Sequence, residues 1–307
     1  MKKRMLGALV LVLLAGCGAP AASQPVSSGE AAPAAVRRLA LPESGERLVL
    51  TEADGAPLLM GWDGGQLQVW RLSQDNWQPQ ALALPEEVQP TAVENLMPGG
   101  TALVSAVDSG GEVCLLEGGP DRPFAPVPLP EAGEFDGFRS PCRAGDGLSL
   151  TLTRYETFTD EQGRTQTTVV PLPVENRMYG PDGQAAVWGD GPAGDVYTTP
   201  VSDGQRMYCV DLTDNGLVTV EADGSWRKEG VLEGWNGGAL FARDGRVYYP
   251  GKDGVRCWPD GAVLRDAGAP WTQSGIFVGS LCVTDRQVLA LCLDTNTEEM
   301  QLYAWTL

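Results

Sequence analysis

The chain has 307 residues, with 40 acidic and 22 basic side chains, and its formal net charge is −18 at pH 7. Such an acidic surface repels nucleic acid and anionic lipid headgroups, so we expect no nucleic-acid partner. The chain contains no histidine, which excludes Ser-His-Asp and Cys-His nucleophile systems and metal sites built from imidazole.

Residues 1–16 have the form of an export signal. The cationic start KKR at 2–4 precedes an apolar run at 5–14, which is about as long as a secretory signal core and too short to span a bilayer. The motif LAGC at 14–17 resembles the bacterial lipoprotein signal. That resemblance implies cleavage before Cys17 and a lipid, carrying acyl chains such as palmitate, on its thiol. We therefore expect an exported, lipid-anchored protein of the cell membrane or envelope.

Residues 17–36 are expected to form the acylated cysteine and a flexible tether. This stretch is rich in Ala, Pro, Ser and Gly and has no aromatic residue, so it cannot bury enough apolar surface to fold. The signal carries three basic residues and no acidic one, so the chain after residue 16 has a charge of −21. Residues 37–307 are then the folded part, which we expect to be a monomeric head.

The folded part has the pattern of short antiparallel strands. Apolar and polar residues alternate in runs such as 66–72, 217–222 and 300–307, which is the period of a half-buried strand. Asn215-Gly216 and eleven Asp-Gly pairs provide residues that accept the positive φ of a tight hairpin turn. The Asp-Gly pairs begin at Asp54, Asp63, Asp136, Asp146, Asp182, Asp190, Asp203, Asp223, Asp244, Asp253 and Asp260.

A longer repeat lies over these strands. A Leu-Pro pair that we expect at the end of an exposed edge strand recurs at 41–42, 84–85, 129–130 and 172–173. Forty-odd residues with four strands is the period of a β-propeller blade. The sequence therefore predicts an all-β fold, a six-bladed β-propeller, with a β-sandwich as the alternative. The blades are expected at 43–85, 86–130, 131–173, 174–233, 234–269 and 271–307, with an insertion in the fourth within 188–204.

The last predicted blade has only three strands, and residues 36–42 (VRRLALP) have the pattern of an outer strand. We expect this N-terminal strand to complete the last blade, because that closure removes free edges and ties the chain ends together. Seven blades would result if 174–233 held two copies of the repeat.

Two stretches carry a family resemblance. The segments DGQRMYCVDLTDNG at 203–216 and DGRVYYPGKDGVRCW at 244–258 resemble the repeats of quinoprotein-like and WD40-type bacterial propellers. The resemblance implies the propeller fold and carries over no functional residue.

Six cysteines follow Cys17, and in an exported chain they could pair as disulfides. Five of them lie in strand-like runs, where a thiol serves as a small buried hydrophobe. We favour mostly free, buried thiols. The six are Cys114, Cys142, Cys209, Cys257, Cys282 and Cys292.

The sequence shows no phosphate loop, dinucleotide fingerprint, nucleophile elbow or calcium loop, so we predict no cofactor, no metal site and no catalytic residue. Aromatic residues are the better candidates for a binding face. Trp235 and Trp271 are expected where the chain enters two inner strands, and Arg154 and Tyr155 lie in the long hairpin expected in blade three. Exposed tryptophans stack on sugars or anchor protein partners. The alternative is that both tryptophans pack between blades.

These observations favour a membrane-anchored envelope lipoprotein with a non-enzymatic propeller that binds a protein partner or an extracellular ligand such as a glycan. A scaffold for envelope assembly is a variant of this hypothesis. The enzymatic alternative is a carbohydrate-active lyase or a carboxylate-based glycosidase on the same fold, which requires acidic groups converging near the axis, beside a Tyr or a Lys.

Overall fold

A computed structural model describes residues 36–43, 45–129, 137–171, 177–180, 185–187, 197–265, 269–272 and 275–307. The expected export signal, Cys17 and most of the expected tether lie outside these ranges. Residues 33–307 form one compact unit. None of the described residues forms a helix of the length and hydrophobicity that a membrane crossing requires.

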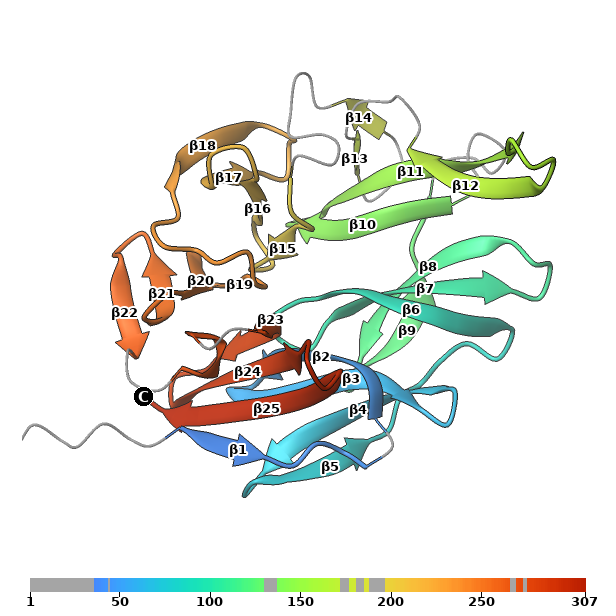
Figure 1. Cartoon of the computed structure of the whole chain (residues 1–307). Coiled ribbons are helices and arrows are strands. Elements are labelled where there is room, and N and C mark those ends of the chain that lie inside the picture. Colours follow the sequence, from blue (N-terminus) through green and yellow to red (C-terminus); the bar gives the residue numbers. More distant parts are fainter. Residues whose placement is uncertain are drawn as a thin grey trace, which may run out of the picture. The chain divides into compact units, whose positions relative to one another are not determined.

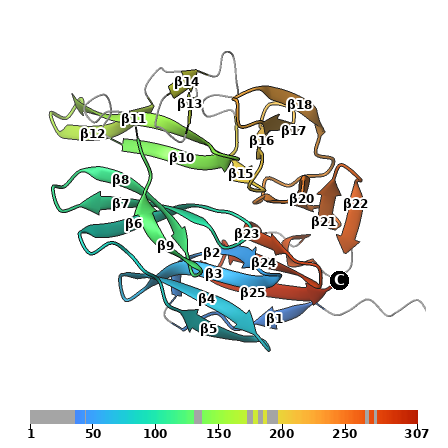
Figure 2. The ribbon, with the colours of Figure 1, turned by 180° about the vertical axis from the view of Figure 1, so that it is seen from behind.

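The compact unit is a six-bladed β-propeller, as the sequence predicts: six small antiparallel sheets arranged in a ring (Figures 1 and 2). Five sheets have four strands each. Blade 1 consists of β2 (Gly45–Ala53), β3 (Ala56–Asp63), β4 (Gln66–Ser73) and β5 (Asn76–Gln80). Blade 2 consists of β6 (Val88–Leu96), β7 (Ala102–Asp108), β8 (Val113–Gly119) and β9 (Arg122–Pro126). Blade 4 consists of β15 (Val201–Ser202), β16 (Met207–Asp211), β17 (Gly216–Val220) and β18 (Trp226–Val231). Blade 5 consists of β19 (Phe241–Arg243), β20 (Arg246–Gly251), β21 (Gly254–Trp258) and β22 (Ala262–Arg265).

The N-terminal strand closes the ring. Blade 6 has the order β1 (Arg37–Leu39), β25 (Glu299–Thr306), β24 (Gln287–Asp294) and β23 (Ile276–Val283). A short 3-10 helix, η1 (Pro270–Thr272), precedes β23. In the β1–β25 ladder, Arg37 lies opposite Ala304 and Leu39 opposite Leu302. The predicted closure by residues 36–42 is confirmed. Because β1 pairs with β25, the C-terminal strand is not an edge strand of its sheet.

Asp-Gly pairs form the expected hairpin turns. Asp54 and Gly55, between β2 and β3, both have positive φ, of 51° and 71°. Asp244 and Gly245, between β19 and β20, have φ of 53° and 73°. Two successive positive φ values match the right-handed twist of the flanking strands, which is why this dipeptide recurs at reversals of the chain.

Blade 3 differs from the sequence prediction. Its sheet has five strands: β10 (Gly137–Ala144), β11 (Gly147–Thr159), β13 (Arg177–Tyr179) and β14 (Ala185–Val187) in order, with β12 (Thr165–Pro171) paired to β11. The long β11 pairs with β13 through residues 148–150 and with β12 through residues 153–159. The β11–β12 hairpin extends outward from the ring, at the upper right of Figure 1.

The predicted boundary at residue 173 and the predicted insertion in blade 4 were therefore wrong. The additional strands belong to blade 3, and the strands of blade 4 span only 201–231. The reason is that an inserted hairpin has the same alternating pattern as the strands of a blade. Part of the stretch predicted to hold the insertion, 188–196, lies outside the described residues.

The hydrophobic core is divided among the interfaces between neighbouring blades. In the described part of the chain, six clusters of buried side chains occupy these interfaces, each fed by two adjacent blades. The recurring leucines of the Leu-Pro pairs contribute here: Leu41, Leu84 and Leu129 follow the outermost strands and pack against three of these clusters. The period in the sequence thus reflects one apolar contact per connection. Pro130 and residues 172–173 lie outside the described residues.

The six cysteines of the folded part are free thiols, and all but Cys114 are buried. Cys142 and Cys209 lie in the cluster between blades 3 and 4, and Cys282 lies in the cluster between blades 6 and 1. Burial raises the pKa of the Cys209 and Cys292 thiols to about 12. These side chains act as small hydrophobic residues, in agreement with the expectation from the sequence.

Candidate functional site

The first strands of the blades surround the axis of the ring and enclose a cavity of about 600 Å³. We call this cavity the axial pocket. Five blades line it, through β2, β6, β23 and the segments that lead into β15 and β19. Most of its lining residues are Val, Leu, Ala, Gly, Phe, Trp or Pro. Because each blade supplies only a few residues, the pocket exists only when the ring is closed.

Bulges in the inner strands place two residues in this lining. The register between β6 and β7 shifts between Val93 and Asn95, which leaves Glu94 without a partner residue. The register between β23 and β24 shifts in the same way at Gly279. A bulge bends its strand and changes the direction of the side chains beside it. Glu94 and Gly279 both line the axial pocket.

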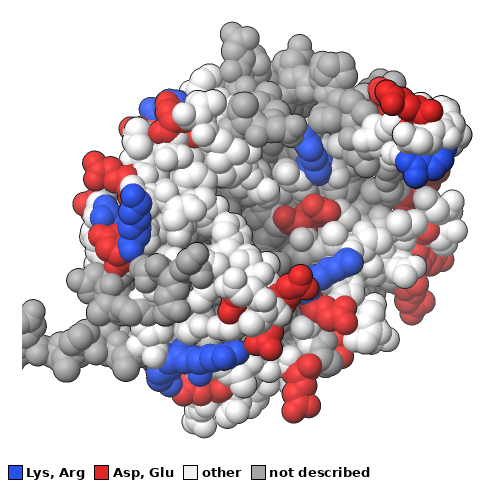
Figure 3. All heavy atoms as spheres, viewed as in Figure 1, with Lys and Arg blue, Asp and Glu red and all other residues white. Residues whose placement is uncertain are grey.

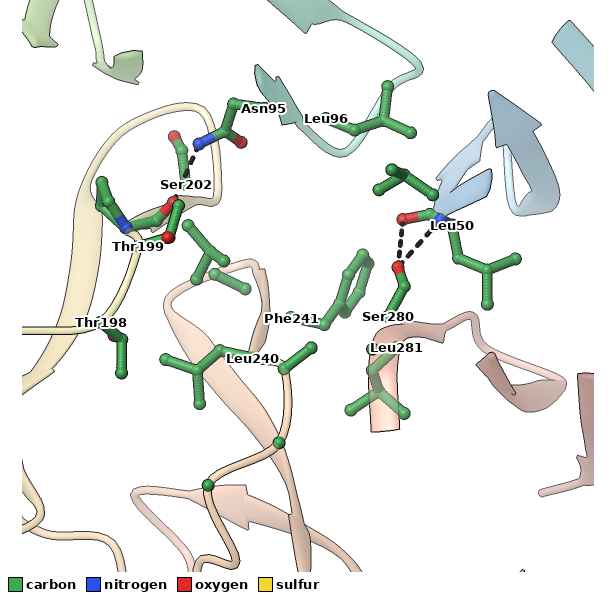
Figure 4. A pocket seen from close by; sticks show the side chains of 18 of the residues that line it. Leu50, Asn95, Leu96, Thr198, Thr199, Ser202, Leu240, Phe241, Ser280 and Leu281 are labelled. Atoms are coloured by element: carbon green, nitrogen blue, oxygen red, sulfur yellow. Dashed lines mark hydrogen bonds between the residues drawn. The ribbon is translucent and has the colours of Figure 1, made fainter. Parts of the chain in front are cut away.

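Hydrogen bonds fix the polar groups of the lining (Figure 4). Asn95 Nδ2 donates to the carbonyl of Pro200 at 2.9 Å, which links blade 2 to blade 4. Ser280 Oγ accepts from the backbone N–H of Leu50 at 2.9 Å and joins blade 6 to blade 1. These contacts between blades hold the walls in place, because buried polar groups paired in this way resist rearrangement.

Glu94 is the one charged residue among the described lining residues. Its Oε1 accepts a hydrogen bond from Ser105 Oγ at 2.6 Å. The described residues form no ion pair with Glu94. A carboxylate has capacity for further hydrogen bonds beyond this one. It is thus the strongest acceptor that the pocket offers to a ligand.

Two apolar residues mark where the pocket opens to solvent. Leu212, in the turn between β16 and β17, is 49% exposed, and Phe277, on β23, is 46% exposed. Single exposed apolar residues are ordinary on protein surfaces, but these two belong to the lining of one apolar cavity, which suits a binding site.

The predicted site residues fall in different places. Trp235 lines the axial pocket, but it is only 9% exposed and its Nε1 donates to the carbonyl of Gly238 at 2.9 Å. Trp271 lies between blades 5 and 6, where its Nε1 donates to the Gly251 carbonyl and its ring lies 5.6 Å from that of Trp305. Both tryptophans also belong to buried clusters between blades, Trp235 between blades 4 and 5 and Trp271 between blades 5 and 6, which is the packing role given above as the alternative.

The two remaining candidates, Arg154 and Tyr155, are described by their backbone positions. The backbones of Arg154 and Tyr155 lie on β11, opposite Val170 and Val169 of β12, so the predicted hairpin is present. Their side chains, like Cys17, lie outside the described part of the structure. The axial pocket draws none of its described lining from β10, β11 or β12.

Sequence reasoning missed Glu94, Asn95 and Phe277. The available signal was the Glu-Asn pair at 94–95, which interrupts the apolar alternation near the end of the first strand of predicted blade two. Consecutive polar residues in an inner strand indicate a bulge or a site on the axis. The exposed Phe277 had no such signal, since it fits an ordinary strand pattern.

A second hollow, of about 330 Å³, lies at the turns that follow β6, β10 and β15. Glu117 stands there between two arginines: Arg143 Nη2 donates to its Oε2 at 2.6 Å, and Arg122 donates to its Oε1. Burial acts to raise the pKa of Glu117, but the hydrogen bonds from these arginines outweigh it, so the pKa lies below its usual value. Asp146 also lines this hollow, so its two carboxylates and two guanidinium groups balance in charge.

Charged side chains elsewhere are interspersed, with acidic and basic groups side by side over the face shown in Figure 3. Among the described residues, no group of three or more His, Cys, Asp or Glu side chains has the arrangement of a metal site. The axial pocket is therefore the feature of the described structure best suited to hold a ligand.

Comparison with known proteins identifies the fold. No protein-family model matches the chain, and no curated protein sequence matches it. A solved structure provisionally assigned as a gluconolactonase is 20% identical, with a TM-score of 0.50 over 90% of this chain and 93% of its own. A streptogramin B lyase is 10% identical, with a TM-score of 0.47 over 90% of this chain and 98% of its own. Regucalcin, a calcium-binding protein from Agrobacterium tumefaciens, is 13% identical, with a TM-score of 0.47 over 89% and 94%. Likeness at these identities shows the propeller fold alone.

Proposed function

We propose that this protein binds a small, largely apolar molecule in its axial pocket. The observation that carries the proposal is the cavity of about 600 Å³ with an apolar lining and an exposed apolar opening. Ligand pockets have volumes of roughly 300–1,000 Å³ and similar linings, with a few polar groups that orient the ligand. Here Glu94 and the hydroxyls of the lining are those groups.

The proposal narrows the hypothesis from the sequence. A binding propeller for a protein partner would use a broad surface with aromatic anchors at its centre. The apolar residues at the centre of this ring line a concave cavity instead, and Trp271 is buried between blades. A small molecule fits such a cavity better than a protein surface does.

We propose further that the propeller is held at the membrane of the cell envelope through a lipid on Cys17. The support is the sequence motif LAGC at 14–17, followed by a tether without aromatic residues. Acyl chains on one cysteine hold a protein at a membrane, because each buried methylene contributes about 0.8 kcal/mol. This proposal places the binding pocket outside the cytoplasm.

Filling the pocket tests its role in binding. Gly279 lines the pocket, and a Cβ added there would meet only the Leu291 carbonyl oxygen, at 3.8 Å. The Cβ of Gly279→Phe therefore has room, and the substitution adds a ring to a residue of the pocket wall. Gly230→Phe, on the outer strand β18, is the matched control, because a Cβ there meets nothing within 4 Å.

The probe is the neutral fluorophore N-phenyl-1-naphthylamine, whose emission rises in apolar surroundings. The native protein and Gly230→Phe should bind it with equal affinity, and Gly279→Phe should bind it at least tenfold more weakly. Equal binding by all three proteins, or none by the native protein, would refute a ligand role for the axial pocket.

A second candidate function is an enzyme that acts on a carbohydrate or a sugar lactone. The fold likeness to a protein provisionally assigned as a gluconolactonase favours this alternative over a protein scaffold. The described lining supplies one carboxylate, Glu94, and neither a Tyr nor a Lys. A screen of glycans and aldonolactones for turnover tests it, and turnover that Gly279→Phe abolishes and Gly230→Phe retains would support it.

A further inference from the structure

We infer that the ligand of the axial pocket carries a positively charged nitrogen, such as an alkylammonium group, and that Glu94 selects it. This inference rests on the proposed function and specifies its ligand class. Its basis is the placement of one carboxylate in a lining that is otherwise uncharged. An apolar body with a single cationic group is the chemistry that complements this arrangement.

The sign of the charge follows from the lining and from the chain. Among the described residues that line the pocket there is no Lys and no Arg, so no protein cation competes for Glu94 there. The chain as a whole has a net charge of −18, and such a field raises the local concentration of cations and lowers that of anions. An anionic ligand would meet repulsion from Glu94 and from the protein as a whole.

The local structure keeps Glu94 available in that position. It lies on the β6 bulge, and Ser105 of the neighbouring β7 fixes its Oε1 at 2.6 Å. The side chain of the next residue, Asn95, donates a hydrogen bond to the carbonyl of Pro200 in the neighbouring part of the pocket lining. A fixed carboxylate that accepts one hydrogen bond from the described residues gains a charge-assisted bond when an ammonium group binds, without reorganising its neighbours.

Three probes of one shape separate charge from shape. They are 3-phenylpropylamine, which is cationic at pH 7.5, the neutral 3-phenylpropan-1-ol and the anionic 3-phenylpropanoate. Each is titrated to displace N-phenyl-1-naphthylamine from the native protein, from Glu94→Gln and from Glu161→Gln. Glu161 is exposed in the β11–β12 turn, so its variant removes the same charge away from the pocket.

For the native protein and Glu161→Gln, the amine should bind about tenfold more tightly than the alcohol, the advantage of one charge-assisted hydrogen bond. The carboxylate should bind most weakly. Glu94→Gln should lose the tenfold preference for the amine and change its affinity for the alcohol less than threefold. Thermal unfolding of each variant checks that it is folded.

The outcomes separate this inference from the proposed function. If the alcohol and the amine bind the native protein equally, or if Glu94→Gln keeps the preference, the inference is overturned while the pocket remains a binding site. If no probe binds and the fluorophore is not taken up, the proposed function itself fails. Equal affinity of the native protein for the amine and the alcohol overturns the inference even where Glu94→Gln does not fold.

Discussion

Truncating one leucine of the N-terminal strand tests whether β1 closes the ring in solution. Leu39 is 8% exposed and belongs to the cluster between blades 6 and 1, where it lies opposite Leu302 in the ladder. Leu→Ala changes in cores cost about 2–5 kcal/mol, depending on how far the site collapses. Because β1 is a three-residue outer strand that relaxes easily, we expect Leu39→Ala to lower the free energy of unfolding by about 2–3 kcal/mol.

The assay is thermal and guanidinium unfolding of residues 33–307. For a domain of this size a loss of that magnitude lowers Tm by about 3–5 °C. Arg38→Ala is the control, because Arg38 is exposed on the same strand and surface changes shift stability by about 0.5 kcal/mol or less. If Leu39→Ala unfolds at the same temperature as Arg38→Ala, β1 does not lock the ring, and the closure inferred here is wrong.

Three further predictions concern the anchor, the thiols and one ion-pair cluster. Cys17→Ser should abolish incorporation of a palmitate analogue and release the protein from the membrane fraction, whereas incorporation by the serine variant would exclude the lipid site. A thiol reagent at pH 8 should modify native residues 33–307 at Cys114 first, since Cys114 is only partly buried whereas burial shields the other thiols and raises their pKa values; six rapidly reacting thiols would contradict the structure. The hydrogen bonds of Arg143 and Arg122 hold the pKa of Glu117 in the folded protein below its value in the unfolded chain. These bonds therefore stabilise the fold fully above the pKa of the unfolded chain, and their contribution is lost as pH falls through the pKa of the folded protein. Glu117→Gln should therefore cost about 1 kcal/mol at pH 7, with a difference from the native protein that narrows below about pH 4, and a constant difference in urea titrations would refute the assignment.

The backbone pattern of this propeller could be predicted from the sequence because its signals are local. An Asp-Gly pair such as Asp54-Gly55 specifies a reversal by the φ values that its two residues accept. The 43- to 45-residue spacing of Leu-Pro pairs reflects one apolar contact per connection, as at Leu41 and Leu84. The missing strand of the last blade and the spare strand at 36–42 together implied closure of the ring. Each inference needed only the residues of one blade or its neighbour.

The tertiary structure alone assigned the extra hairpin to blade 3. The sequences of β12 and β13 show the same alternating pattern, and only the hydrogen-bonded ladders show which part of β11 each of them pairs with. It also decided the site. Glu94 enters the pocket lining at a one-residue shift in the β6–β7 register, and Phe277 and Leu212 line the pocket from different blades. The sequence by itself determined the strands and the turns, since these depend on neighbours along the chain, and the number of strands left over at the two ends implied the ring. The pocket depends on how five blades converge on one axis, which no short stretch of sequence specifies.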